Sequence, residues 1–378
     1  MKHIVYINNY FPDDIIDVRN NEKFFSQPAN NKIQNLVRAL ECADIKTTVL
    51  SSALTSNGKR WYPAIYGNKI SNSNIIYCGV LGLPLINSFT SAFSIYRTIK
   101  CIHRKETINR IVFYNFKPEA AWPAFWANKH LGIPITVEFE DGYRQIEELS
   151  SLKKKIFSYT EHKVKSKVDR AIVANALMKS EFSVPAYVLR GIVNTEFYNL
   201  CNSYKKTSNE YFTVLYSGGL DRSRGIQVLI ESLKYLEIPC RILVTGKGKI
   251  QSSDSRIEHL GFLTYEQMLQ IMMQADLLVQ CQLVNDRFAN VSFPSKLFEY
   301  IATGNHIVSS SLPDVKAFAG DHFFYYENDD PVELAVQIFN VYQLWKAGEE
   351  KDHKVMELCK HNMPEEIGKT ISSFLFQG

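Results

Sequence analysis

The sequence lacks the cysteine and histidine patterns that metal and redox sites require. Its seven cysteines form no CxxC pair, and no histidine stands at metal-ligand spacing from them. Scattered thiols in a chain of 378 residues are typical of small buried side chains in a reducing compartment. The sequence therefore predicts no metal site and no resident cofactor.

Long apolar runs and charge of one sign are also lacking. The apolar segment His3–Ile7 is followed by Asn8 and is too short for the core of a signal peptide. No run reaches the length of a membrane span. The 43 basic and 39 acidic residues give a net charge of +4, without the clustered excess of a nucleic-acid binder. We therefore expect a cytoplasmic protein that binds no nucleic acid and contacts a membrane, at its inner face, only peripherally.

Two series of alternating strands and helices run along the chain, which predicts an α/β fold with parallel sheets. A polar stretch over residues 194–210 has the composition of a linker. We predict one domain over residues 1–200 and a second over residues 201–378, and leave open whether the last helix packs back on the first. The predicted strands are His3–Ile7, Thr47–Ser51, Asn74–Cys78, Arg110–Tyr114, Ile135–Phe139, Arg170–Val173, Ala186–Leu189, Phe212–Ser217, Arg241–Thr245, Arg256–Leu260, Asp276–Gln280 and His306–Ser309.

The loop after the first strand of the second series combines paired glycines with two arginines. Gly218 and Gly219 allow a ligand to approach the backbone closely, and the start of the following helix offers amide groups to phosphate. Arg222 and Arg224 are suited to neutralising a diphosphate. A plain strand-to-helix turn with solvated arginines is the alternative interpretation.

A helix is predicted from Ser295 to Ala302, with Ser295 as its N-cap. Lys296 and Glu299 are three residues apart, so they share one face of this helix. The carboxylate of Glu299 could accept hydrogen bonds from two ribose hydroxyls, while Lys296 and the helix start face phosphate. A surface Lys–Glu pair on an amphipathic helix is the alternative.

These two stretches and the pieces between them resemble glycosyltransferase family 4, whose members have the GT-B fold. The resemblance implies two Rossmann-like domains facing across a cleft, with the acceptor side in the first and the donor site in the second. It adds Gly246, Phe262 and Leu263 to the expected donor-binding residues. The matching pieces are Gly218–Gly225, Thr245–Gly248, His259–Leu263, Asp276–Gln280 and Glu299–Val308.

The resemblance implies transfer of a sugar from a nucleotide-diphosphate sugar to a glycan or lipid-linked acceptor. Retention of configuration, no metal and a place in bacterial surface polysaccharide or lipopolysaccharide synthesis follow from the same resemblance. The chain departs from the family where Gly219 replaces an arginine, Arg224 a lysine and Val291 a glutamate. A sugar-nucleotide epimerase of the same fold and a catalytically degenerate nucleotide-sugar-binding partner are the alternatives.

Three carboxylates stand at the carboxyl end of a predicted strand in the first domain. Alternation along the strand places Glu138 and Glu140 on one face and Asp141 on the other. A carboxylate there could orient the acceptor or take its proton, so we assign Glu140 and Asp141, together with Arg224, as catalytic. An Asx turn at Asp141, with a nearby salt bridge, is the structural alternative.

Residues 151–167 form a predicted helix in which lysines alternate with aromatic and aliphatic side chains. Such a mixture, running from Lys153 to Lys167, suits peripheral contact with an anionic membrane surface. A solvated basic helix is an equally good interpretation. The apolar segment Leu81–Ile99 either contributes to the same contact or belongs to the core.

Overall fold

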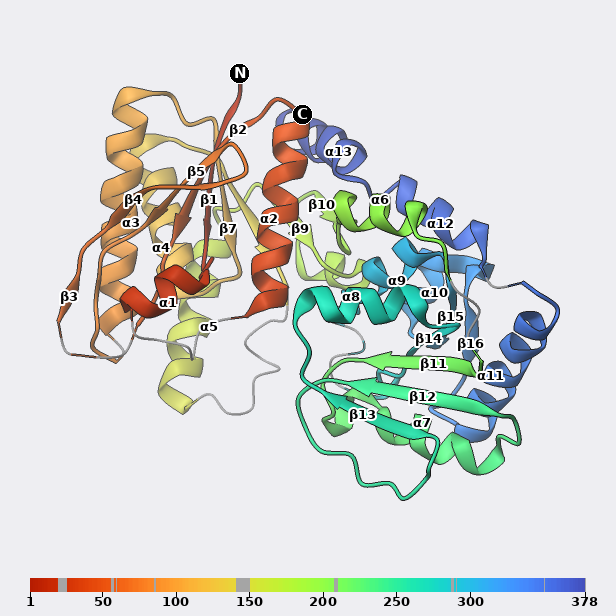
Figure 1. The fold of residues 1–378 in the computed structure, drawn as a ribbon. Coiled ribbons are helices and arrows are strands. Elements are labelled where there is room, and N and C mark those ends of the chain that lie inside the picture. The colour runs from red at the N-terminus through yellow and green to blue at the C-terminus, as the bar shows by residue number, and fades with distance from the viewer. Residues whose placement is uncertain are drawn as a thin grey trace. The chain divides into compact units, whose positions relative to one another are not determined.

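The computed structural model describes residues 1–19, 26–55, 58, 60–84, 86–140, 150–206, 210–286, 289, 291–349 and 351–377. The chain divides into two compact units (Figure 1). The first contains Met1–Ile192 together with Pro364–Gly378, and the second contains Val193–Met363. Each unit is built around a mainly parallel sheet with helices beside it, which confirms the predicted α/β class.

The sheet of the first unit has eight strands in the order β10-β9-β8-β7-β1-β2-β5-β4. Neighbours are parallel except β4 and β5, which are antiparallel. Successive strands are added on one side of β1 and then, from β7 onward, on the other side, as in doubly wound nucleotide-binding folds. The switch point of this sheet therefore lies between β1 and β7, which are parallel. The strands are β1 (His3–Asn8), β2 (Lys46–Ser51), β4 (Ile65–Ile70), β5 (Ser73–Tyr77), β7 (Arg110–Tyr114), β8 (Ile135–Phe139), β9 (Arg170–Val173) and β10 (Ala186–Val188), beside a small antiparallel pair of β3 (Trp61–Tyr62) and β6 (Val80–Leu81).

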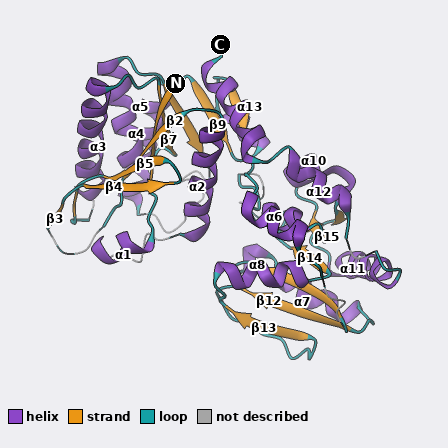
Figure 2. Ribbon diagram, turned by 45° about the horizontal axis from the view of Figure 1, so that its top comes forward, coloured by secondary structure: helices purple, strands orange, loops and turns teal. Residues whose placement is uncertain are grey.

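Helices cover both faces of this sheet (Figures 1 and 2). Successive residues of a strand point to opposite faces, so Val5 and Ile7 of β1 join one core while Ile4 and Tyr6 join the other. The first core is closed by α3 (Ile86–Lys105), α4 (Pro118–Leu131) and α5 (Ser151–Lys165). The second is closed by α2 (Gln27–Cys42) and α13 (Pro364–Phe376), with α1 (Asp13–Arg19) beside them.

The last helix packs on the first unit through a close approach to α2. A Cβ atom at Gly368 of α13 would lie 2.0 Å from the carbonyl oxygen of Ala39 in α2, so only glycine allows this spacing. Ile367, Ile371 and Leu375 of α13 are buried in the core beneath. The C-terminal segment therefore completes the hydrophobic core of the first unit.

The sheet of the second unit has the order β13-β12-β11-β14-β15-β16, and all its neighbours are parallel. In chain order this is 3-2-1-4-5-6, the arrangement of dinucleotide-binding folds, so the switch point lies between β11 and β14. The strands are β11 (Phe212–Ser217), β12 (Cys240–Thr245), β13 (Ile257–Gly261), β14 (Leu277–Gln280), β15 (His306–Ser310) and β16 (Phe324–Tyr326). The helices are α6 (Thr195–Ser203), α7 (Ile226–Ser232), α8 (Tyr265–Gln274), α9 (Leu297–Thr303), α10 (Pro313–Ala319), α11 (Pro331–Lys346) and α12 (His353–Lys360).

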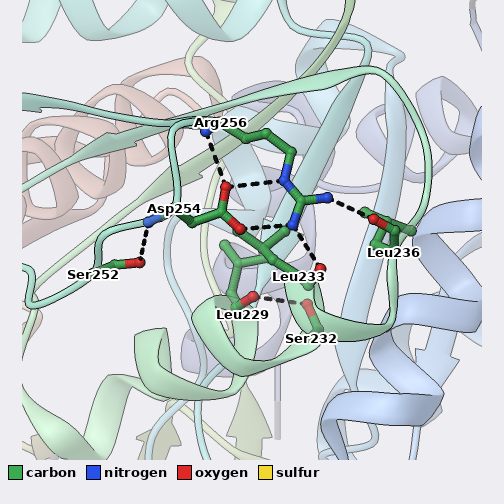
Figure 3. A network of polar contacts seen from close by, with 7 residues as sticks. All are labelled: Leu229, Ser232, Leu233, Leu236, Ser252, Asp254 and Arg256. Carbon is green, nitrogen blue, oxygen red and sulfur yellow. Dashed lines mark hydrogen bonds and ion pairs between the residues drawn. The ribbon is translucent and has the colours of Figure 1, made fainter.

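Arg256 ties the end of the α7 segment to the start of β13 (Figure 3). Its guanidinium binds both carboxylate oxygens of Asp254, at 3.0 and 2.6 Å, and donates to the carbonyls of Leu233 and Leu236 at 2.6 and 2.5 Å. The Arg256 hydrogen bond lowers the pKa of the Asp254 carboxyl. The guanidinium thereby adds charged donors to two carbonyls at the end of this helical segment.

Every predicted strand is present and is displaced by at most one residue at either end. The described residues contain four strands that the sequence analysis did not predict: the short pair β3 and β6, and the strands β4 and β16 at the edges of the two large sheets. Because β4 and β16 are the outermost strands, all the inner strands of both sheets are predicted ones.

Candidate active site

Three loops are joined by backbone hydrogen bonds at the carboxyl edge of the second sheet. The amide of Gly218, after β11, donates to the carbonyl of Thr245 at 3.0 Å. The amide of Gly246, after β12, donates to the carbonyl of Gly261 at 2.9 Å. Sequence analysis assigned these loops to one ligand, and the structure brings them together beside the switch point.

The contact between the first two loops requires glycine. A Cβ atom at Gly246 would lie 1.7 Å from the carbonyl oxygen of Gly218, and the φ of Gly246 is +148°. Gly248, with a φ of +134°, would place a Cβ atom 2.6 Å from that of Leu220. The two backbones therefore lie closer together than any side chain would permit.

Tyr216 of β11 fixes the glycine loop through hydrogen bonds to its backbone. Its buried hydroxyl donates to the carbonyl of Gly219 at 2.7 Å and lies 3.3 Å from that of Arg224. Burial raises the pKa of this tyrosine, so the hydroxyl remains a donor at neutral pH. Within the described residues, the amide of Gly219 has no hydrogen-bond partner, whereas that of Gly218 is occupied.

Two exposed arginines follow the glycine loop. Arg222 and Arg224 belong to the 3₁₀ turn η4 (Arg222–Arg224), and Gly225 then turns the chain into α7 with a φ of +69°. A Cβ atom at Gly225 would lie 1.8 Å from the carbonyl oxygen of Cys281, just after β14. This contact fixes the arginine turn against the switch point.

The short helix α9 lies against the end of β11. The Ser217 amide donates to the Tyr300 hydroxyl at 3.2 Å, and both residues are buried. Tyr300 follows Glu299 in the chain, and Ser217 precedes Gly218. The predicted glycine loop and the helix that carries Glu299 are therefore neighbours.

Lys296 and Glu299 both face Tyr265 of α8. The Lys296 ammonium lies 2.9 Å from the sulfur of Met268 and 6.0 Å from the Tyr265 ring centre. The Tyr265 hydroxyl is 3.5 Å from the Glu299 carboxylate. Burial raises the pKa of the Glu299 carboxyl, and the Lys296 charge partly opposes this effect. Lys296 and Glu299 therefore lie on the same side of the segment, as predicted. The sequence analysis did not predict the Tyr265 hydroxyl beside them.

The predicted N-cap role of Ser295 is wrong. Helix α9 begins at Leu297, and the carbonyls of Pro294 and Ser295 accept hydrogen bonds from Leu297 and Phe298 in a preceding turn. The side chain of Ser295 caps nothing and is exposed. The Pro–Ser pair resembles a helix start in sequence, but the chain first makes one tighter turn.

The two residues expected near the nucleobase differ in exposure. The Phe262 side chain is 73% exposed, and the Lys247 ammonium lies 5.3 Å from its ring centre. Leu263 is half-buried and packs against the core on the α8 side. An aromatic face that projects from the loop after β13 is available for stacking.

Gln282 was missed by the sequence analysis. It follows β14 at the switch point and is 4% exposed, yet neither its side-chain nitrogen nor its side-chain oxygen has a partner within the described residues. Its backbone carbonyl accepts from Ser310 at 2.6 Å. A buried amide without partners costs stability and calls for a ligand or water at its polar atoms. The detectable sign was a polar residue two positions after the end of an apolar strand.

The acidic cluster of the first unit is built around Lys32 of α2, which was also missed. Its ammonium lies 2.5 Å from Glu138 and 2.5 Å from Glu140, so both carboxylates share one face as predicted. Tyr6 donates to Glu138, and Tyr114 donates to Glu140 at 3.1 Å. Burial lowers the pKa of Lys32, but the two carboxylates outweigh it and raise the pKa overall.

This network lies at the carboxyl ends of the first sheet. Glu140 is held by a hydrogen bond from its amide to the side chain of Asn115 at 2.8 Å. Asp141 lies outside the described residues. Among the described residues, no group of three or more histidine, cysteine or acidic side chains is arranged to hold a metal ion. No helix within the described ranges of the chain is long and apolar enough to cross a membrane.

Several solved structures have a similar fold. Sucrose-phosphate synthase from Thermosynechococcus elongatus matches with a TM-score of 0.68 and 13% identity, over 100% of this chain and 99% of that one. HepE from Anabaena in complex with UDP-glucose matches with a TM-score of 0.62 and 12% identity, over 99% of each chain. The lipopolysaccharide outer core galactosyltransferase WaaB has the same values of 0.62, 12% and 99%. At these identities, the likeness shows a common fold, the GT-B fold of two α/β units.

The second unit also matches a family in sequence. Residues 211–343 match the model described as glycosyl transferases group 1. No curated protein matches the sequence. Residues 211–343 are therefore similar to group 1 glycosyltransferases, and the chain has the GT-B fold.

Proposed function

We propose that the chain transfers a sugar from a UDP-sugar to a glycan or lipid-linked acceptor in surface polysaccharide synthesis. The observation that carries the proposal is the hydrogen bond from Ser217 to Tyr300, which joins the glycine loop to the helix of Glu299. Structures of HepE with UDP and with UDP-glucose support the donor, and WaaB, a lipopolysaccharide galactosyltransferase, supports the acceptor class.

The donor diphosphate is proposed to lie against the glycine loop. The amide of Gly219 is available to it, and the exposed guanidinium groups of Arg222 and Arg224 add positive charge. Gly218 contributes by its lack of a side chain, since its amide already binds Thr245. When the bond to the sugar breaks, negative charge grows on the diphosphate oxygens, and Arg224 would stabilise it.

The ribose and the base are proposed to lie between α9 and the loops after β12 and β13. Glu299 would accept from two ribose hydroxyls, while the Tyr265 hydroxyl lies beside its carboxylate and the nearby charge of Lys296 favours its ionised form. Phe262 and Leu263 would form the wall against the base. Gly246 is assigned to the same pocket, and Ser295 remains assigned to the phosphate through its backbone.

The sugar is proposed to bind to the side-chain amide of Gln282. Its unpartnered amide offers both a donor and an acceptor, which suits a pair of sugar hydroxyls. On the first unit, Glu140 and Asp141 are proposed to orient the acceptor hydroxyl. Lys32 would hold the Glu140 carboxylate in position through their 2.5 Å contact. Retention of configuration is part of the proposal.

The proposal is tested by donor binding and by transfer. UDP should raise the melting temperature more than GDP or CMP, and Arg224→Ala and Glu299→Ala should abolish transfer without unfolding the chain. Arg241→Ala is the matched control, because Arg241 is an exposed arginine of the same unit that pairs with Glu258. Wild-type turnover in both site variants would overturn the assignment. Conversion of a UDP-sugar to its epimer without an acceptor would favour an epimerase instead.

A further inference from the structure

The helices α3, α4 and α5 lie side by side over one face of the first sheet (Figures 1 and 2). They contain ten basic residues and two acidic ones, whereas the rest of the chain contains 33 basic and 37 acidic residues. Both acidic residues, Glu119 and Glu161, are buried. The mild positive charge of the protein is therefore concentrated on this layer, in Arg97, Lys100, Arg104, Lys105, Lys129, Lys153, Lys154, Lys155, Lys163 and Lys165.

Within the residues that the structure describes, little of this charge is neutralised by acidic side chains. In the described part of the chain, Lys165 alone among the ten forms ion pairs, with Glu161 at 3.4 Å and Glu181 at 3.8 Å. Lys153, Lys154 and Lys155 are consecutive and exposed at the start of α5. Uncompensated cations at this density attract an anionic surface.

A continuous row of aromatic rings crosses the same three helices. Tyr96 of α3 lies 5.7 Å from Trp126 of α4, which stacks on Trp122 at 6.1 Å. Trp122 in turn lies 6.1 Å from Tyr159 of α5. All four rings are at least partly exposed. Tryptophan and tyrosine are the side chains that accumulate at the level of lipid headgroups.

Large apolar side chains project beside this row. On α3, Ile86, Phe89 and Phe93 are 48%, 49% and 57% exposed, and their spacing places them on one helix face. On α5, Leu152 and Tyr159 are 56% and 57% exposed. Such residues on a basic helix enter the boundary between headgroups and acyl chains when the helix lies in the membrane plane.

We propose that this layer, called here the α3–α5 surface, docks the protein on an anionic lipid bilayer. The cations bind the headgroups, and the phenylalanines with the aromatic row enter the interface. A nucleic acid would match the charge but would leave Ile86, Phe89 and Phe93 exposed to water, so the bilayer matches both properties. The proposal goes beyond the proposed function, because it requires neither a donor nor an acceptor.

Vesicle sedimentation with the full chain tests the proposal. Binding should be strong to vesicles of phosphatidylcholine mixed with phosphatidylglycerol, weak to phosphatidylcholine alone, and reduced by salt. Each cation near an anionic bilayer contributes about a fivefold change in the partition coefficient. The triple variant Lys153→Gln, Lys154→Gln, Lys155→Gln should therefore bind on the order of a hundredfold more weakly.

The apolar part is tested separately with Phe89→Ser and Phe93→Ser, which together should weaken binding at least about tenfold at constant charge. The matched controls are exposed residues of the second unit: Lys234→Gln, Lys346→Gln and Lys354→Gln for the charge, and Phe339→Ser for the apolar contact. These controls should bind vesicles as the wild type does. All variants should keep the wild-type melting temperature and the response to UDP.

Three results would overturn the proposal. The first is equal binding to neutral and anionic vesicles. The second is wild-type binding by the triple lysine variant. The third is binding to double-stranded DNA under conditions in which anionic vesicles are not bound. Because the vesicle assay contains no sugar nucleotide, its failure is distinguishable from failure of the transferase assay.

Discussion

The hydroxyl of Tyr300 accepts a hydrogen bond from the amide of Ser217 at 3.2 Å. Burial raises the pKa of Tyr300, so the phenol is uncharged at neutral pH. The contact fixes α9 to the last residue of β11, and with it the position of Glu299 relative to the glycine loop. A single side chain thereby sets the spacing between the proposed ribose and diphosphate contacts.

Replacement of Tyr300 by phenylalanine should loosen this spacing. The buried Ser217 amide would lose its partner, which costs about 1–3 kcal/mol of unfolding free energy. Affinity for UDP should fall as well, and urea denaturation and calorimetry measure the two effects. Tyr235→Phe, at a tyrosine that is 58% exposed, serves as the control and should change neither. Unchanged stability and affinity in Tyr300→Phe would remove the role given to this bond.

Gly246→Ala should separate the two glycine loops. The added methyl group would overlap the Gly218 carbonyl, so the loops must move apart and UDP binding should be lost. Gly132→Ala is the matched control, because Gly132 also has a positive φ, +69°, but no other atom lies within 4 Å of the place that its methyl group would take. It should cost only about 1 kcal/mol and leave UDP binding intact. Calorimetric titration of both variants with UDP decides the matter, and normal binding by Gly246→Ala would contradict the loop geometry.

Local sequence patterns were sufficient to predict the inner strands, because a parallel strand buried on both faces is a short apolar run. The edge strand β4 was missed because four of its six residues are polar, small or exposed, as an edge permits. The start of α9 was misplaced because Pro294 and Ser295 have the composition of a helix start but form a separate turn. Short-range composition does not distinguish these two geometries.

The residues of the site that sequence analysis found are those carried by contiguous motifs, such as Gly218 and Glu299. Lys32 was missed because its role depends on the pairing of α2 with the end of β8, which no local pattern encodes. Tyr300 and Gln282 were missed for a related reason. The importance of each comes from a contact, or a missing contact, across the sheet.

Ionisation of Glu299 should control donor binding. Burial raises the pKa of this carboxyl above its unfolded value of about 4.3. The folded chain then binds the proton more tightly, so stability falls as pH rises between the two values and the penalty is complete above the folded pKa. Glu299→Gln should therefore stabilise the ligand-free chain at neutral pH but weaken UDP binding roughly tenfold to a hundredfold.

The pH dependence separates this effect from titration of UDP itself. As the pH falls through the raised pKa of Glu299, wild-type affinity should drop toward that of Glu299→Gln, which lacks the titrating group. Calorimetric titrations of both proteins over the acidic range measure the difference. A constant ratio of the two affinities at every pH would show that Glu299 does not bind the donor in its ionised form.

Gln282→Met should also stabilise the ligand-free chain, because it removes two buried polar atoms that lack partners within the described residues while it preserves volume. The expected gain is about 1–2 kcal/mol. Affinity for a UDP-sugar should fall, whereas affinity for UDP should not, since the proposed contact is to the sugar. Denaturation and parallel titrations with UDP and UDP-glucose test this, and an equal loss for both ligands would place Gln282 at the nucleotide instead.

Lys32→Met should destabilise the first unit more than any surface lysine variant. It leaves Glu138, whose side chain is 1% exposed, and Glu140, at 19%, without their shared cation. Breaking a buried ion pair on one side costs about 3–5 kcal/mol. Urea denaturation of the variant and of the wild type at neutral pH measures this cost.

The titration of Lys32 itself does not interfere with this test. Burial lowers its pKa, but Glu138 and Glu140 raise it further, so the folded pKa exceeds the unfolded value of about 10.4. The stabilisation from the pair is thus fully present below that unfolded value and is lost only as the pH rises through the folded pKa. Adding Glu138→Gln to Lys32→Met should recover part of the loss, and a double variant less stable than Lys32→Met would contradict the ion-pair account.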